Sequence, residues 1–313
     1  MTYDLVAIGN PVYDIIITPY ISTKGRVLSG CSTNACLAAA KLGMKNVALI
    51  GCIGKDHHTK FVNDLKKYGI SSPNVKLLEE TGGFKLVYDP TGDRTLEVLG
   101  TAGKITQDDI PEECLDTRYI LIGPILQEVD LKLIQFLKEN SEAKIFLDPQ
   151  GLVRKIGPNK QILYHNEKET MKKIVSLVDF VKPNEHESPV ITGANDPIVS
   201  AKILTEWGSP VAIITLAERG SIVLSKGKLT RIPPYKTVAL DPTGAGDTYA
   251  GSFIFEHDKT GNVISSCFFA SAAASIMVEN TGPDFPMTEK EVRRRLATIK
   301  RSPRENEKPQ QRS

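Results

Sequence analysis

Short apolar segments alternate with amphipathic stretches along most of the chain. The apolar segments are bounded by turn residues, and the stretches between them repeat their apolar positions with helical spacing. Strands that alternate with helices predict a parallel sheet covered by helices on both faces. The expected strands are Leu5–Ile8, Val47–Ile50, Tyr119–Ile122, Ile145–Leu147, Phe180–Val181, Val211–Thr215 and Ile222–Leu224, and the expected helices include Asn34–Leu42, Lys60–Tyr68, Val129–Asn140, Asp196–Trp207 and Val263–Val278.

Two regions depart from this alternation. Residues 12–29 and 81–99 predict pairs of strands, and residues 89–93 (DPTGD) have the composition of a hairpin turn. One interpretation is a small β element that stands off the main sheet as a lid, and the other is two ordinary edge hairpins. Residues 1–300 are expected to form one α/β domain with a central, mostly parallel sheet.

Composition and cysteine usage set the class of protein. The chain has 41% hydrophobic and 24% charged residues, which is typical of a globular domain. No apolar run approaches the ~18–20 residues of a membrane helix, and the N-terminus lacks the basic start and long apolar stretch of a secretion signal. We therefore expect a cytoplasmic protein without membrane attachment. The five scattered cysteines predict small buried residues and neither a disulfide framework nor a cysteine metal site.

The charge of the chain is localised at its C-terminus. The formal net charge of +2 is carried by residues 301–313, a polar tail that we expect to be disordered. The other residues balance, with no block of lysines and arginines. The sequence therefore predicts no nucleic-acid partner.

The segment from Leu240 to Gly251 (LDPTGAGDTYAG) carries the strongest chemical signal. The turn Gly244-Ala245-Gly246 lets backbone N–H groups converge, and the helix that follows adds its positive N-terminal end, so the segment predicts an anion hole. Asp247 follows directly, and a carboxylate at this place suits a base that takes a proton from the hydroxyl attacking a phosphoryl group. A simple helix N-cap is the alternative for the short motif alone.

Polar residues near the first two turns are candidates for substrate binding. Asn10 and Asp14 follow the first strand, at the edge where ligands bind in parallel sheets. The Asp14 carboxylate suits bidentate hydrogen bonding to neighbouring hydroxyls, although an isolated aspartate here is also a turn former. Gly30 and Asn34 lead into a helix, and Asn34 is either a helix cap or a polar contact for substrate hydroxyls.

Further candidates follow later strands. Asn184 and Glu187 are spaced to share one face of a helical turn, where oxygen ligands hold Mg²⁺ through water, and a capping box is the alternative. Residues 215–220 (TLAERG) form a turn that covers a nucleotide or merely closes a hairpin. Arg154 is expected in a surface salt bridge, with contact to an anionic group as the alternative. Plausible site-lining residues at strand ends are Gly123, Asp148 and Gln150.

In this order the motifs resemble those of the ribokinase-like (PfkB) family of carbohydrate kinases over about residues 3–300. The resemblance implies a three-layer α/β sandwich with a small β lid at residues 12–29 and 81–99. It also implies an ATP-dependent kinase that transfers the γ-phosphoryl group to a hydroxyl of a small sugar or cyclic polyol, with Mg²⁺ as cofactor. The implied roles are catalysis for Asp247, Gly244, Ala245 and Gly246; substrate binding for Asp14, Gly30 and Asn34, to which Asn10 and Gln150 are added from their positions; nucleotide binding for Thr215, Gly220, Thr243, Gly244 and Gly246; and magnesium binding for Asn184 and Glu187.

The chain departs from the family pattern at three positions. Ser29 replaces the first of two glycines, Pro242 replaces a threonine, and Ala217 replaces a glycine. Some relatives bind K⁺ beside the anion hole, where Asp241 would be one ligand, and a homodimer through the lid is a further expectation. A nucleoside kinase and a non-catalytic ligand-binding member are the alternative functions. An NAD-dependent enzyme is disfavoured, because the turn after the first strand lacks Gly-x-Gly-x-x-Gly.

Overall fold

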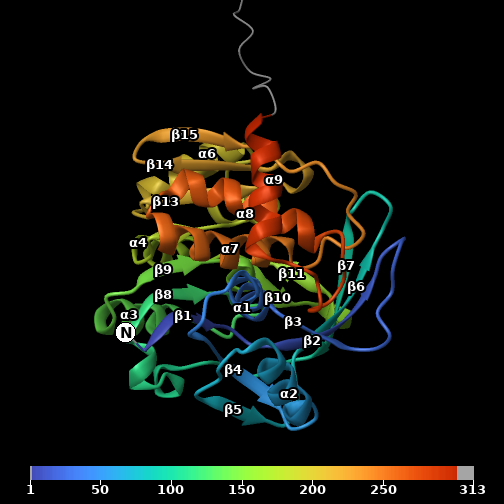
Figure 1. The fold of residues 1–313 in the computed structure, drawn as a ribbon. Helices are drawn as coiled ribbons and strands as arrows, with labels where there is room; N and C mark the ends of the chain where they lie inside the picture. Colours follow the sequence, from blue (N-terminus) through green and yellow to red (C-terminus); the bar gives the residue numbers. More distant parts are fainter. Residues whose placement is uncertain (1, 302–313) are drawn as a thin grey trace, which may run out of the picture.

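A nine-stranded sheet forms the centre of the molecule in the computed structural model, which describes residues 2–301 (Figure 1). Its strand order is β15-β14-β13-β12-β9-β8-β1-β4-β5. All pairings from β13 to β5 are parallel. The strands are β1 (Tyr3–Ile8), β4 (Val47–Gly54), β5 (Val75–Leu78), β8 (Thr117–Ile122), β9 (Lys144–Leu147), β12 (Phe180–Val181), β13 (Val211–Thr215), β14 (Ser221–Ser225) and β15 (Lys228–Ile232).

One end of the sheet is antiparallel, in agreement with the expectation of a mostly parallel sheet. The predicted strand Ile222–Leu224 lies in β14, which pairs antiparallel with β13 and with β15. The connection from β13 to β14 is only a short 3-10 turn, Ala217–Arg219, and a parallel neighbour would need a crossover of a dozen or more residues. The edge strands β5 and β15 were not predicted, because exposed edges do not require a continuous apolar run.

Helices cover both faces of the sheet, as predicted. Successive residues of a strand point to opposite faces, so Leu5 and Ala7 belong to one core while Val6 and Ile8 belong to the other. The first core is completed by α1 (Cys31–Leu42), α2 (His58–Tyr68), α7 (Ala245–Thr260), α8 (Val263–Met277) and α9 (Glu289–Arg301). The second is completed by α3 (Leu131–Asn140), α4 (Lys168–Ser176), α5 (Glu187–Thr192) and α6 (Pro197–Glu206).

Helices α1 and α7 pack unusually closely. A Cβ atom on Gly251 of α7 would lie 2.1 Å from the carbonyl oxygen of Ala35 in α1, so only glycine permits this approach. The contact brings the N-terminal ends of the two helices together. Those ends carry the residues that the sequence singled out for chemistry.

The predicted strand pairs form a separate four-stranded sheet, which we call the lid sheet (Figure 1). Its order is β3-β2-β6-β7, and it has its own small apolar core that includes Ile16 and Phe84. This arrangement excludes the interpretation as two edge hairpins of the main sheet. The strands are β2 (Val12–Ile17), β3 (Val27–Ser29), β6 (Gly83–Tyr88) and β7 (Arg94–Gly100), and the nearby hairpin consists of β10 (Arg154–Ile156) and β11 (Ile162–Tyr164).

The C-terminal residues, the length of the helices and the cysteines were also subjects of prediction. Of the predicted tail, residues 302–313 lie outside the described residues, and Arg301 is the last residue of α9. Within residues 2–301, none of the helices combines the length and apolar character that a membrane span needs. All five cysteines are buried and unpaired, as predicted.

Candidate functional site

The N-terminal ends of α1 and α7 meet at the carboxyl edge of the parallel sheet. Gly30 precedes α1 with φ of 115°, and Gly244 precedes α7 with φ of 79°, a left-handed conformation that favours glycine. A Cβ atom on Gly244 would also lie 3.0 Å from Nδ2 of Asn34. The turn at Gly244 therefore has the left-handed conformation that the motif predicted, and it lies so close to the Asn34 side chain that glycine is favoured there.

Asp247 lies in the first turn of α7, beside this glycine turn. Its Oδ2 accepts a hydrogen bond of 2.9 Å from Nδ2 of Asn34, and its Oδ1 lies 3.4 Å from Nε2 of Gln150. Burial and the nearby Asp148 carboxylate raise the pKa of Asp247, while the Asn34 hydrogen bond and the charge of Lys182 act in the opposite direction. A raised pKa brings a carboxylate closer to the range in which it is an effective general base.

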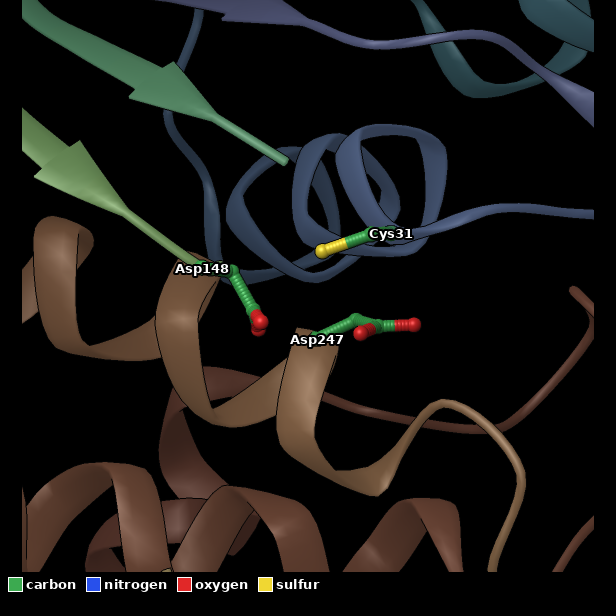
Figure 2. Close-up of side chains that lie close together, drawn as sticks. All are labelled: Cys31, Asp148 and Asp247. Carbon is green, nitrogen blue, oxygen red and sulfur yellow. The ribbon is translucent and has the colours of Figure 1, made fainter. Parts of the chain in front are cut away.

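Asp148 and Cys31 face Asp247 across the site (Figure 2). Ligand-type atoms of these three side chains all lie within 4.8 Å of one another. Burial, reinforced by both carboxylates, raises the pKa of the Cys31 thiol well above its ordinary value, so the sulfur stays protonated. The sequence had indicated Asp148 as a lining residue, but Cys31 was expected only as a small buried residue.

Lys182, directly after β12, supplies a positive charge that the sequence analysis missed. Its Nζ forms a 2.8 Å ion pair with Asp148, and both side chains are buried. Burial lowers the pKa of Lys182, but the Asp148 carboxylate outweighs burial and raises it above its usual value. A Cβ atom on Gly246 would lie 3.3 Å from this Nζ, so the ammonium lies against the glycine turn. Its position at a strand end, just before the Asn184 motif, was the available signal.

Asn184 and Glu187 form the capping box that the spacing allowed. Glu187 N–H donates to Oδ1 of Asn184 at 2.9 Å, and Asn184 N–H donates to Oε2 of Glu187 at 3.0 Å. Burial and Asp148 raise the pKa of the Glu187 carboxyl. Its Oε1 has no hydrogen-bond partner among the described residues and is not enclosed, so it remains available to a metal-bound water. The donor set therefore fits Mg²⁺ through Glu187 better than through Asn184, whose oxygen already accepts two bonds.

The predicted nucleotide turn lies next to this capping box. Thr215 ends β13, and its carbonyl accepts a 3.0 Å hydrogen bond from the N–H of Glu185. Gly220 has φ of 85°, and a Cβ atom there would lie 2.1 Å from the carbonyl oxygen of Ile232. Ala217, which replaces a family glycine, also has a positive φ of 48°.

Asp241 and Thr243 shape the loop before the glycine turn. The fully buried Asp241 carboxylate accepts a 2.8 Å bond from the N–H of Thr243 and a 2.6 Å bond from the hydroxyl of Thr281. Its oxygens thus already hold the loop in place. The hydroxyl of Thr243 lies 2.9 Å from that of Tyr88 in the lid sheet.

Hydrogen bonds join the lid sheet, and the residue that follows β2, to this loop. Besides the Tyr88–Thr243 contact, the Thr18 hydroxyl donates a 2.8 Å bond to the carbonyl of Leu240. Arg94, from the lid, donates a 2.7 Å bond to the Tyr88 hydroxyl. No local motif marked these residues, because their role depends on where the lid lies.

Asp14 and Asn10, the two predicted substrate-binding residues near the first strand, lie in different places. Asp14 belongs to β2 of the lid sheet, and its Oδ1 accepts a 2.7 Å bond from the N–H of Phe84. Burial raises the pKa of Asp14 to about 6. The Asn10 amide has partners at both ends, donating 2.8 Å to the carbonyl of Gly103 and accepting 2.8 Å from the N–H of Cys52. Asn10 therefore connects segments of the chain, as well as lining a cavity.

That cavity lies beneath the lid sheet and has a volume of about 330 Å³. Asn10, Gly83 and Ile125 are among its lining residues, whereas Asp14, Asn34 and Asp247 are not. Gly123 is also outside the lining, and a Cβ atom there would lie 2.8 Å from Sγ of Cys31. The cavity thus adjoins the candidate site without reaching the base.

Arg154 corrects the expectation of a surface salt bridge. The side chain is only 4% exposed, and within residues 2–301 it makes no ion pair. It begins β10, directly after the 3-10 turn η3 (Gln150–Val153), and that turn packs against α5. The sequence could not reveal this burial, since β10 and β11 are short and their exposed positions alternate irregularly.

Comparison with known proteins agrees with the fold. The model of the pfkB family of carbohydrate kinases matches residues 4–290. A cytidine kinase of Thermococcus kodakarensis is 32% identical over 271 residues, which cover 84% of this chain and 91% of the relative. A ribokinase of Lactococcus lactis is 25% identical over 289 residues, covering 90% of this chain and 89% of the relative.

Solved structures share the fold. A sulfate complex of a pyrophosphate-dependent kinase in the ribokinase family has a TM-score of 0.79 at 22% identity, covering 92% of this chain and 99% of the other. The ribokinase of Thermotoga maritima has a TM-score of 0.74 at 22% identity, covering 94% and 99%. The chain therefore belongs to the PfkB family of carbohydrate kinases, with the ribokinase fold, and is a kinase.

Proposed function

We propose that this kinase transfers the γ-phosphoryl group of ATP to a hydroxyl of a small sugar or cyclic polyol, with Asp247 as the base. The observation that carries the proposal is the position of the Asp247 carboxylate. It lies in the first turn of α7, directly beside the left-handed glycine turn, and is oriented by the 2.9 Å hydrogen bond from Asn34. A proton acceptor and a backbone anion site thereby adjoin the same small space.

The proposed step is a single in-line displacement. The acceptor hydroxyl oxygen forms a bond to the γ-phosphorus as the bond to the bridging oxygen of ATP breaks, and ADP leaves with that electron pair. The hydroxyl proton moves to a carboxylate oxygen of Asp247. Negative charge on the phosphoryl oxygens is stabilised by the N–H groups of Gly244, Ala245 and Gly246 and by the ammonium of Lys182.

Metal binding is assigned to the Glu187 side of the site. Mg²⁺, when bound, neutralises charge on the phosphate oxygens of the donor. Glu187 would hold it through water with its unpartnered Oε1, and Asn184 fixes the orientation of Glu187 through the capping box. Thr215, Gly220 and Thr243 are proposed to contact the nucleotide. For K⁺, Asp241 is a weaker candidate than the motif suggested, because both its oxygens already accept hydrogen bonds.

The acceptor is proposed to lie between the lid sheet and α1, held by Asp14, Gly30, Asn34 and Gln150. None of these four residues lines the cavity of about 330 Å³ beneath the lid sheet, so that cavity does not define the size of the acceptor. Membership of the family of carbohydrate kinases supports a sugar or polyol. A nucleoside acceptor is the second candidate, and the specific observation in its favour is the 32% identity to a cytidine kinase over 84% of the chain.

A screen of ADP release tests the proposal. Pentoses, hexoses, cyclic polyols and nucleosides are each supplied with ATP and Mg²⁺, with K⁺ or Na⁺ as the monovalent salt. We expect turnover with a sugar or polyol, whereas turnover with nucleosides alone would select the second candidate. Parallel reactions with pyrophosphate as donor, monitored through the phosphorylated product, would overturn the ATP assignment if only pyrophosphate supported transfer.

Two further expectations accompany this function. Use of ATP agrees with a cytoplasmic location, which fractionation of cells would check. A homodimer through the lid is proposed from the resemblance, and Tyr20 and Val87 of the lid region expose apolar side chains that such contact would cover. Light scattering that gives the mass of a monomer at micromolar concentration would contradict the dimer.

A further inference from the structure

Arg154 is a buried arginine, and none of the acidic residues that the structure describes lies within ion-pair distance of it. The residue is 4% exposed, and its Nε is fully enclosed without a hydrogen-bond partner. Within the described part of the chain, the guanidinium forms neither a hydrogen bond nor an ion pair. Its two terminal nitrogens are not enclosed, so they retain contact with solvent. Buried arginines are rare unless paired, so this arrangement needs an explanation.

The surroundings place Arg154 at the phosphate end of the site. It begins β10 directly after η3, and η3 packs against α5, whose first residue is the candidate magnesium residue Glu187. Nε2 of Gln150, the first residue of η3, lies 3.4 Å from the Asp247 carboxylate. The charge of Arg154 acts on Glu187 without forming an ion pair with it among the described residues. Lys182 also acts on Glu187, but its ammonium is already paired with Asp148 at 2.8 Å. Glu187 itself accepts its hydrogen bond from Asn184. Arg154 is therefore the buried cation of this group that still has all its side-chain donors unused.

We propose that Arg154 binds an oxygen of the phosphoryl group that the enzyme transfers, opposite the glycine turn and on the Glu187 side. The inference rests on the proposed function. Planar guanidinium groups match phosphate oxygens with two parallel N–H bonds, and such charge-assisted bonds are about twice as strong as neutral ones. The glycine turn, Lys182 and Arg154 would then surround the transferring group with donors from three separate elements.

A purely structural role makes a different prediction from a binding role. A structural arginine would be paired with a carboxylate or with backbone carbonyls, and its removal would destabilise the fold. A buried arginine that binds a ligand lowers the stability of the fold while the ligand is absent, because its charge is then unpaired. Removing its charge is therefore expected to stabilise the ligand-free protein while weakening phosphate binding.

The test compares Arg154→Met and Arg154→Lys with a matched control, Arg294→Met. Arg294 is an exposed arginine of α9 that pairs, among the described residues, with Glu291 of the same helix. The melting temperature is measured without ligand and with inorganic phosphate, and dissociation constants are measured for ADP and for the non-hydrolysable ATP analogue AMP-PNP, each with Mg²⁺.

For Arg154→Met we expect a higher melting temperature without ligand and no stabilisation by phosphate. The dissociation constant of AMP-PNP should rise about 10- to 100-fold, the usual loss for a hydrogen bond to a charged group, while that of ADP changes little. Arg154→Lys should lie between this variant and the wild type, because it retains charge but not the planar fork. Arg294→Met should match the wild type in all ligand measurements.

Three outcomes would overturn the assignment. A lower melting temperature with unchanged AMP-PNP affinity would mean a structural role. An equal loss of ADP and AMP-PNP affinity would move Arg154 away from the transferring group. Loss of stabilisation by phosphate, with AMP-PNP affinity unchanged, would place the bound anion on the acceptor instead. If wild-type protein bound neither ADP nor AMP-PNP, the proposed function would fail, and stabilisation by phosphate would still decide the role of Arg154.

Discussion

Asn34 of α1 donates a 2.9 Å hydrogen bond to the Asp247 carboxylate of α7, although the two residues are 213 positions apart in the chain. The contact depends on the close packing of the two helices, which Gly251 permits by having no Cβ beside the carbonyl of Ala35. The orientation of the proposed base is therefore a property of the helix pair. The hydrogen bond to the proposed base thus depends on the packing of α1 against α7.

Asp247→Asn is expected to lower turnover by roughly 10²–10⁴-fold, the usual contribution of a general base. Donor binding should change little, because asparagine is nearly the same size and its side-chain oxygen can still accept from Asn34. Steady-state kinetics and calorimetric titration with the donor measure the two quantities. Asp108→Asn, at an exposed aspartate outside the site, is the control. Near-normal turnover in Asp247→Asn would contradict the assigned role.

Asp14 predicts a pH dependence of stability with a definite sign. Burial raises its pKa from 3.8 to about 6, despite the opposing hydrogen bonds from Ser29 and Phe84 and the charges of Arg26 and Arg94. Between these values the folded protein binds a proton that the unfolded chain has released, so the free energy of unfolding falls as pH rises. The loss is on the order of 3 kcal/mol between pH 4 and pH 6, and it levels off above that range.

Urea unfolding of wild type and Asp14→Asn across pH 4–7.5 measures this contribution. The wild-type curve contains other groups, so the difference between the two proteins is the relevant quantity. We expect the advantage of Asp14→Asn over the wild type to grow from pH 4 to pH 6 and then remain constant. A difference that does not change with pH would show that Asp14 titrates as an ordinary carboxyl.

Lys182→Met should be strongly destabilising, since it leaves the Asp148 carboxylate buried without its partner. Breaking a buried pair in this way lowers the free energy of unfolding by about 3–5 kcal/mol. The double variant Lys182→Met/Asp148→Asn should recover part of the loss. Lys55→Met, which removes a lysine 60% exposed from a surface pair with Glu79, should cost at most about 1 kcal/mol. Equal costs for the two lysines in urea unfolding would show that the buried pair is not special.

Tyr88→Phe should loosen the contact between the lid sheet and the glycine-turn loop. The variant loses the hydroxyl that lies 2.9 Å from Thr243 and accepts from Arg94, at a cost of about 1 kcal/mol in stability. A less firmly held lid excludes water less well, so ATP hydrolysis without acceptor should rise relative to phosphoryl transfer. The ratio of the two rates is the readout. Tyr20→Phe, at a lid-region tyrosine 66% exposed, should leave that ratio unchanged, and an equal effect of both variants would exclude a role for the Thr243 contact.

Local patterns were sufficient for much of the fold. Buried parallel strands need continuous apolar runs, and the helices between them need one apolar face. Both patterns can therefore be recognised within a short stretch of sequence. Turns such as the one at Gly244 are equally local, because a left-handed residue followed by a helix needs glycine wherever it occurs. The alternation of elements, the strands of the lid sheet and the glycine turn before Asp247 were therefore all predictable.

Contacts between segments that are distant in the sequence could not be predicted from local patterns. Lys182 and Asp148 pair because β12 and β9 are neighbours in the sheet, and Tyr88 meets Thr243 because the lid sheet lies over the loop before α7. Arg154, expected at the surface, is buried at the Glu187 side and has no acidic partner within residues 2–301. A sequence determines such positions only through the energy of the whole packed fold. The amino-acid sequence by itself determined the class of fold and the chemistry-bearing turn. Only the tertiary structure decided which buried charges are paired, because pairing depends on how distant segments pack together.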